Sequence, residues 1–90
     1  MRKMVDGKVL VRFATVRRSR YVTLAGQTHV VAVGRLYASK GYAVAWRPVG
    51  ATDTRWRLLS GPWPTSARAV VEFAGTVDRL TADPSPLEVH

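Results

Sequence analysis

The segment 66–80 carries the pattern that most limits what this chain can fold into. Its apolar residues recur at the spacing of an amphipathic helix, and they are Val70, Phe73, Ala74, Val77 and Leu80. Thr65 or Ser66 can cap the start of this helix with a side-chain oxygen. A helix of this kind must bury its apolar stripe against a second layer. The remainder of the chain therefore has to supply a matching apolar surface.

The segment 42–59 is predicted to supply that surface as a β-hairpin. Residues 42–47 alternate between apolar and small or charged side chains, 48–54 have the composition of a loop, and 55–59 form the return strand. We expect Trp46 to lie opposite Trp56. The face toward the helix would then consist of Tyr42, Val44, Trp46, Trp56 and Leu58.

The N-terminal part is predicted to add further strands. Segments 8–16 and 20–24 are rich in Val, Phe, Tyr and Thr, and the polar residues 17–19 between them suit a hairpin turn. Residues 25–27 form a second turn. The segment 29–38 can be a helix that begins at Thr28 or a strand with a bend at Gly34; its valines and its glycine favour the strand.

These elements predict an α+β fold. An antiparallel sheet, made of an N-terminal hairpin and the hairpin 42–59, packs against one C-terminal helix over about 66–80. Residues 1–80 form a single small domain, and 81–90, with two prolines, form a flexible tail. Strand edges of such a sheet can pair between copies, so a homo-oligomer stays open.

The size and composition of the chain limit its chemistry. Ninety residues build one modest core, and the absence of cysteine excludes disulfides and thiolate metal sites. No apolar run approaches the roughly 20 residues of a membrane helix, and the N-terminus does not resemble a signal peptide. We expect a cytoplasmic protein without a cofactor, a metal or a membrane partner. The only histidines are His29 and His90, and no nucleotide-binding glycine motif is present, so an enzyme is not expected.

The charge of the chain is concentrated in its first two thirds. Residues 1–57 hold 12 Lys and Arg against Asp6 and Asp53, a net charge of 12 − 2 = +10, while residues 58–90 have a net charge of 2 − 4 = −2. Such a distribution attracts polyanions. We expect a nucleic acid, with DNA favoured; the alternative is the acidic surface of a partner protein. A genome rich in G and C also favours arginine codons, so codon bias is a competing source of these residues.

The candidate binding residues are basic side chains in three groups. Arg47, Arg55 and Arg57 are expected to share the sheet face that points away from the helix, and a two- or three-stranded ribbon of this kind fits the major groove. Arg17, Arg18 and Arg20 lie at the predicted hairpin tip, where they can contact phosphates. Arg35 and Lys40 complete the set. The alternative interpretation is an ordinary solvated face and turn.

The stretch from 34 to 73 resembles a known family. Gly34, Gly41-Tyr42, Trp46-Arg47, the basic strand 55–59, Trp63-Pro64-Thr65 and Ala69 resemble the AP2-like, arm-type DNA-binding domain of phage and transposon tyrosine recombinases. The resemblance implies a three-stranded sheet in the major groove with the helix packed behind it. It also implies a stand-alone accessory protein from a phage or mobile element, because 90 residues leave no room for a recombinase catalytic domain.

A weaker resemblance connects 57–63 and the Ala-rich helix after it to the peptidoglycan-binding SPOR domains. The first interpretation remains a small non-catalytic DNA-binding accessory or regulatory protein. The alternative is a protein–protein interaction module, such as a phage virion or host-takeover component that docks on an acidic partner.

Overall fold

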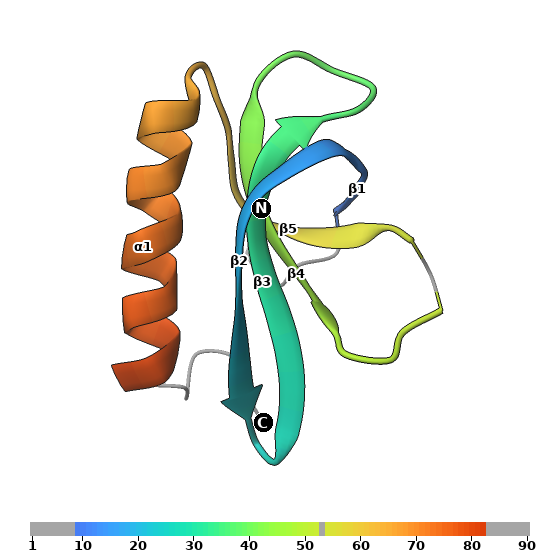
Figure 1. Ribbon diagram of the computed structural model, residues 1–90, viewed down its shortest axis with the longest axis vertical. Coiled ribbons are helices and arrows are strands. Elements are labelled where there is room, and N and C mark those ends of the chain that lie inside the picture. Colours follow the sequence, from blue (N-terminus) through green and yellow to red (C-terminus); the bar gives the residue numbers. More distant parts are fainter. Residues whose placement is uncertain (1–8, 53, 83–90) are drawn as a thin grey trace.

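The computed structural model describes residues 9–52 and 54–82, which form one sheet and one helix (Figure 1). The elements in chain order are β1 (Leu10–Val11), β2 (Phe13–Leu24), β3 (Gln27–Leu36), β4 (Tyr42–Pro48), β5 (Trp56–Trp63) and α1 (Ser66–Ala82). All strand pairs are antiparallel, and the strand order is β1-β5-β4-β3-β2. The predicted α+β class, with an antiparallel sheet packed against a C-terminal helix, is confirmed.

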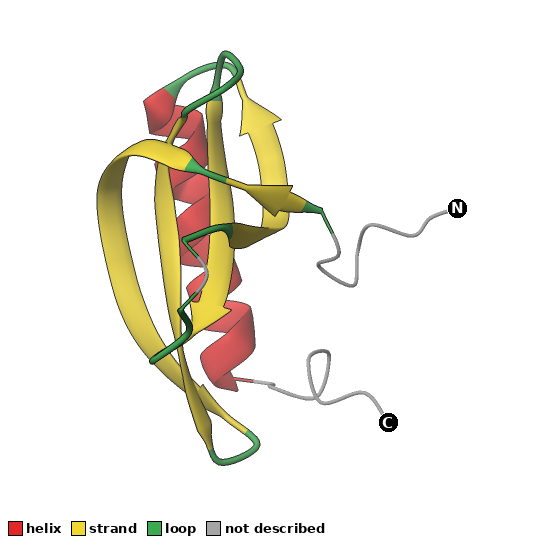
Figure 2. Ribbon diagram, turned by 90° about the vertical axis from the view of Figure 1, so that its right-hand side faces the viewer, coloured by secondary structure: helices red, strands yellow, loops and turns green. Residues whose placement is uncertain are grey.

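The sheet curls until its two edges meet. β1 and β2 are the two edge strands, yet only Arg12 separates them in the chain. Two backbone hydrogen bonds tie this crossing to the remainder of the sheet, from Leu58 N to Val9 O at 2.8 Å and from Tyr37 N to Arg12 O at 2.9 Å. Figure 2 shows β2 bowing away from this crossing toward the hairpin that it forms with β3. One bent N-terminal stretch therefore closes the sheet.

Curling creates two apolar clusters, one on each side of the central strands. The outer cluster lies between the sheet and α1. It consists of Val22, Leu24, Val31, Val33 and Val44 from the sheet and Ala69, Phe73, Val77 and Leu80 from the helix. The inner cluster, inside the curl, joins Ala32, Ala45 and Trp56 to Val11, Phe13 and Val30. The rings of Phe13 and Trp56 meet edge to face, with centroids 5.3 Å apart. Such aromatic geometry adds to the stabilisation from area burial.

The first hairpin differs from its prediction. Residues 17–19 do not turn; they continue β2, and the hairpin tip is formed by Ala25 and Gly26, both with positive φ. The turn predicted over 25–27 is therefore the true tip. Polar residues in 17–20 resemble a turn in sequence because most of β2 is exposed and has no apolar alternation. Of the segment 29–38, residues 29–36 are extended as favoured, in β3, and 37–38 lie in the loop after it.

The second hairpin forms, but its register differs from the prediction. Trp46 pairs with Arg57 rather than with Trp56, and Ala45 pairs with Leu58. A shift of one residue moves a side chain to the other face of a sheet, so Trp56 lies in the inner cluster. Two register shifts, between Tyr42 and Val44 and between Val44 and Ala45, accompany the change. β5 also continues through the predicted break to Trp63.

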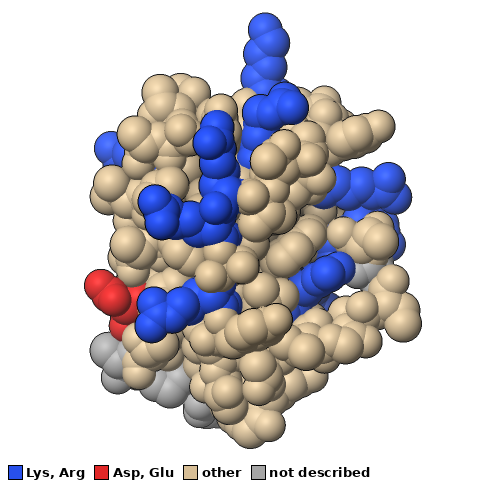
Figure 3. Space-filling model, viewed as in Figure 1, with Lys and Arg blue, Asp and Glu red and all other residues tan. Residues whose placement is uncertain are grey.

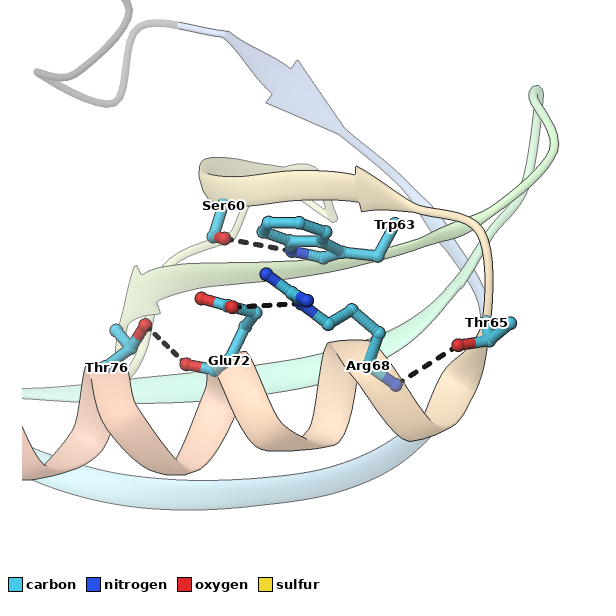
Figure 4. Close-up of polar contacts among 6 residues, drawn as sticks. All are labelled: Ser60, Trp63, Thr65, Arg68, Glu72 and Thr76. Carbon is cyan, nitrogen blue, oxygen red and sulfur yellow. Dashed lines mark hydrogen bonds and ion pairs between the residues drawn. The ribbon is translucent and has the colours of Figure 1, made fainter.

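The helix agrees with its predicted stripe and start. Phe73, Val77 and Leu80 are buried and Val70 is half-buried, whereas Ala74 is exposed. Thr65 Oγ1 accepts a hydrogen bond from Arg68 N at 3.2 Å, the geometry of an N-cap (Figure 4). The helix extends two residues beyond its predicted end, to Ala82. Of the predicted tail, residues 83–90 lie outside the described residues.

Gly34 lies where β2 and β3 approach most closely. A Cβ at this position would collide with the carbonyl oxygen of Thr15 and would lie 3.0 Å from Val16 Cα and 3.1 Å from Phe13 Cδ1. Register shifts in β2 flank the contact, between Phe13 and Thr15 and between Val16 and Arg18. The bend predicted at Gly34 thus corresponds to a bulged region in the partner strand.

Replacing Gly34 should loosen the closure of the sheet. We expect Gly34→Ala to lower the free energy of unfolding by about 1–3 kcal/mol, because backbone atoms of β2 must move to make room. Gly75→Ala is the matched control, since a Cβ there meets nothing within 4 Å and should stabilise α1 by about 0.5–1 kcal/mol. Urea denaturation measures both. Equal effects of the two variants would contradict the close approach at Gly34.

Removing the helix cap gives a second stability prediction. Thr65→Ala should lower the free energy of unfolding by about 0.5–2 kcal/mol, because the amide of Arg68 loses its acceptor. Thr65→Ser keeps that acceptor and should remain close to the wild-type value. Urea denaturation followed by circular dichroism distinguishes them; indistinguishable stabilities of the Ala and Ser variants would show that Thr65 does not act as a cap.

Candidate nucleic-acid interface

Charge is distributed unevenly between the two layers of the structure, because α1 carries Arg68 and Arg79 together with two carboxylates. Among the described residues, all carboxylates lie on α1, as Glu72 and Asp78. The sheet and its loops carry nine cations, which we call the basic sheet surface: Arg12, Arg17, Arg18, Arg20, Arg35, Lys40, Arg47, Arg55 and Arg57. In Figure 3 basic side chains spread over the face in view, and acidic atoms appear only at the edge where the helix lies.

The three arginines expected to form one patch lie in three places. Arg47 is on the inner face, with its guanidinium carbon 4.6 Å from the centroid of Trp56. Arg57 pairs with Trp46 and therefore shares the face that α1 packs on. Arg55 precedes β5 and lines a pocket beside β1. The predicted grouping is wrong because the register of β4 and β5 differs by one residue.

The inner face is also partly covered by the chain's own N-terminal stretch. Val11 and Phe13 pack on Ala32, Ala45 and Trp56, where a flat ribbon would present its surface to DNA. The part left accessible includes one cross-strand row, Tyr21–Val30–Arg47. Tyr21 is 72% exposed, so this row carries an aromatic ring at one end and a guanidinium at the other, with Val30 between them.

The arginines of β2 lie along an exposed edge strand rather than at a tip. Arg18 and Arg20 are cross-strand partners of Val33 and Val31, which places them on the same face as α1, at its margin. Arg17 lies over the ring of Tyr42, 5.8 Å from its centroid. Arg35 also pairs with Tyr42. The β2 edge and the end of β3 thus bring four of the predicted cations onto one side of the sheet.

Lys40 and Trp63 meet at the start of the helix. They line a shallow pocket with Gly41, Pro62 and Pro64. Trp63 Nε1 donates to Ser60 Oγ at 2.9 Å, and the guanidinium of Arg68 lies 4.7 Å from the ring centroid. Arg68 Nε is also 3.1 Å from a carboxylate oxygen of Glu72 (Figure 4). Because Arg68 already covers this ring, Trp63 serves the packing of the helix start.

Two residues that the sequence analysis did not select belong to the site. Arg12 and Tyr37 line a pocket at the closure of the sheet, together with Arg55. Tyr37 is 69% exposed, although its amide is held by the carbonyl of Arg12. No local pattern points to them, because β1 and β5 are about 45 positions apart in the chain and their pairing creates the pocket.

His29 is buried on the helix side of the sheet and stacks on Trp46. The two ring centroids are 4.2 Å apart at an angle of 31°. Within the part of the chain that the structure describes, neither His29 Nδ1 nor Trp46 Nε1 has a hydrogen-bond partner. Burial lowers the pKa of His29 and the positive charge of Arg57 lowers it further, while the backbone of Gln27 acts in the opposite direction.

Comparisons with known proteins identify no relative. The chain matches no family model, no curated protein and no solved structure. Residues 9–52 and 54–82 contain no cluster of three or more His, Asp or Glu side chains placed to hold a metal ion. In the same ranges, no helix has the length and apolar character to cross a membrane.

The depressed pKa of His29 predicts a pH-dependent stability. Above the ordinary histidine pKa of 6.5 the imidazole is neutral in both folded and unfolded chains. As the pH falls below that value the unfolded chain takes up a proton first, so the free energy of unfolding should decrease until the folded imidazole titrates. His29→Phe keeps a ring against Trp46 and should remove this decrease. Urea denaturation between about pH 5.5 and 7.5 tests it; parallel curves for the two proteins would argue against the effect.

Proposed function

We propose that this protein is a small non-catalytic nucleic-acid-binding domain with an accessory or regulatory role, and that DNA is its first choice of ligand. The observation that carries the proposal is the separation of charge between the layers. Nine cations lie on the sheet and its loops, and the described carboxylates lie on the helix. Because Arg68 and Arg79 offset those carboxylates, the net positive charge of the described residues lies on the sheet and its loops, and a polyanion is attracted there.

The kind of cation supports a phosphate-bearing ligand. Eight of the nine residues are arginines, whose planar guanidinium binds phosphate oxygens in pairs. Exposed tyrosines lie among them, at Tyr21 and Tyr37, and aromatic rings stack with bases. The only described histidine, His29, is buried against Trp46 and gives no support to an enzymatic role.

The mode of binding that we propose differs from a ribbon inserted in the major groove. Such a ribbon needs one open face across β3, β4 and β5, and Val11 and Phe13 cover part of that face. Contacts along the exposed β2 edge and around the closure of the sheet use the basic side chains without opening the core. The affinity should then come mainly from phosphate contacts and fall steeply with salt.

Salt dependence tests the proposal. Each phosphate contact contributes about −0.9 to the slope of log K against log salt on duplex DNA and about −0.7 on a single strand. We expect the double variant Arg18→Thr, Arg20→Thr to flatten the slope by about 1–2 units, because both side chains belong to the basic sheet surface. Fluorescence anisotropy of a labelled DNA of mixed sequence gives the slope.

The control removes the same charge from the helix. Arg68→Gln, Arg79→Gln has the same net charge as the first variant but leaves the sheet intact, so its slope should stay within about half a unit of wild type. Circular dichroism confirms the fold of both. Equal slopes for the two variants, or no DNA binding at low salt, would refute the proposal; capture of an acidic protein by nuclease-treated wild type would favour the interaction module instead.

A further inference from the structure

A pocket of about 320 Å³ lies where the sheet closes. Its walls come from three separated parts of the chain: β1 with the crossing residue, the loop after β3, and the residue before β5. We call it the closure pocket and define it by Val11, Arg12, Leu36, Tyr37, Ser39 and Arg55. It belongs to the basic sheet surface but differs from the remainder of that surface, because it is concave and is lined by apolar residues as well as cations.

The two guanidinium-bearing residues of the pocket are positioned by backbone pairing. Leu10 pairs with Arg57 and Val11 with Trp56; Arg12 follows β1, Arg55 precedes β5, and both line the pocket. The amide of Tyr37 donates to the carbonyl of Arg12 at 2.9 Å. This hydrogen bond fixes the loop that carries Tyr37 and Ser39 against the crossing. The backbone segments that carry Arg12 and Tyr37 are therefore held against each other.

The chemistry of these side chains matches the parts of a nucleotide. A pair of guanidinium groups can bind a phosphate through several parallel hydrogen bonds. Tyr37, 69% exposed, offers a ring face to a base, and the hydroxyl of Ser39 can donate to or accept from a polar edge. Val11 and Leu36 add apolar surface to the lining, which an apolar base face can contact. The volume lies near the lower limit of about 300 Å³ for ligand pockets, which is suited to a single nucleotide.

A base can enter such a pocket only when it is unpaired. In a duplex the base faces are stacked on their neighbours, and extruding one base costs a few kcal/mol. In a single strand the bases are free to stack on protein aromatic rings. The covered inner face also favours a single strand as the ligand, because Val11 and Phe13 occupy part of the surface that a duplex groove would need.

We infer that the closure pocket binds one unpaired nucleotide, with its phosphate between Arg12 and Arg55 and its base on Tyr37, so that the protein prefers single-stranded nucleic acid over duplex. This inference rests on the proposed nucleic-acid-binding function and names its ligand class. The other cations of the sheet surface contact the neighbouring phosphates of the same strand.

The test compares single strand with duplex in matched variants. Labelled oligothymidylate of about 15 nucleotides and a duplex of the same length are titrated by fluorescence anisotropy at equal salt. We expect the single strand to bind at least about 10-fold more tightly. Tyr37→Ala should weaken single-strand binding by about 5- to 100-fold and leave duplex binding unchanged, because only the stacking partner is lost. Tyr37→Phe keeps the ring and should bind like wild type.

Two further variants separate the pocket from general charge and from exposed aromatic rings elsewhere. Tyr21→Ala removes the other strongly exposed tyrosine, and we expect it to weaken single-strand binding less than Tyr37→Ala does, because Tyr21 lies outside the closure pocket. Arg12→Gln should flatten the single-strand salt slope by about 0.7. Oligouridylate and oligodeoxyuridylate as further probes share one base and differ only in the sugar: equal binding assigns the pocket to either nucleic acid, and weaker binding of oligouridylate assigns it to DNA.

The outcomes separate this inference from the function on which it rests. Absence of binding to every probe at low salt overturns both. Duplex binding as tight as single-strand binding, with Tyr37→Ala indistinguishable from Tyr21→Ala, overturns the closure pocket and leaves the nucleic-acid function standing. Since Tyr37 is largely exposed, its substitution leaves the cores intact, and unchanged thermal unfolding of the variant verifies this.

Discussion

The packing of Trp56 inside the curled sheet is the contact on which the remainder of the structure depends. Its ring meets Phe13 edge to face and lies on Ala32 and Ala45, whose small side chains leave it room. A ring of this size inside the curl draws β1 to β5 and bends the N-terminal stretch across the sheet. Without that ring Val11 and Phe13 would keep only the small side chains of Ala32 and Ala45 as buried partners in the cluster, and the closure of the sheet would be weaker.

Closure on one side and the helix on the other bury the central strands on both faces. Residues 31–34 of β3 and 43–45 of β4 are consecutive and all buried. Strands with two covered faces lose the alternation of apolar and polar residues that marks a half-exposed strand. This explains why 29–38 can be interpreted as helix or strand from its sequence, and why the outer strand β2, exposed along most of its length, resembles loop and turn.

Features that depend on residues close together in the chain could be predicted from the sequence, whereas features that depend on distant residues could not. The helix, its cap at Thr65 and the existence of the hairpin 42–59 depend on neighbours a few residues apart, and they were predicted correctly. The register of β4 and β5 depends on bulges and on the burial of Trp56, which act across the whole sheet. Because one residue of register decides the face, this single difference separated Arg47 from Arg57. The pocket formed by Arg12 and Tyr37 requires the closure and has no local signal.

The same closure shapes what the basic surface can bind. A net positive charge alone attracts any polyanion and does not distinguish its form. Geometry adds the distinction: the curl covers part of the face that a duplex groove would contact, and where the sheet closes it creates a concavity lined by both cationic and apolar residues. Thus the N-terminal stretch that completes the inner cluster also determines which part of the cationic surface is concave.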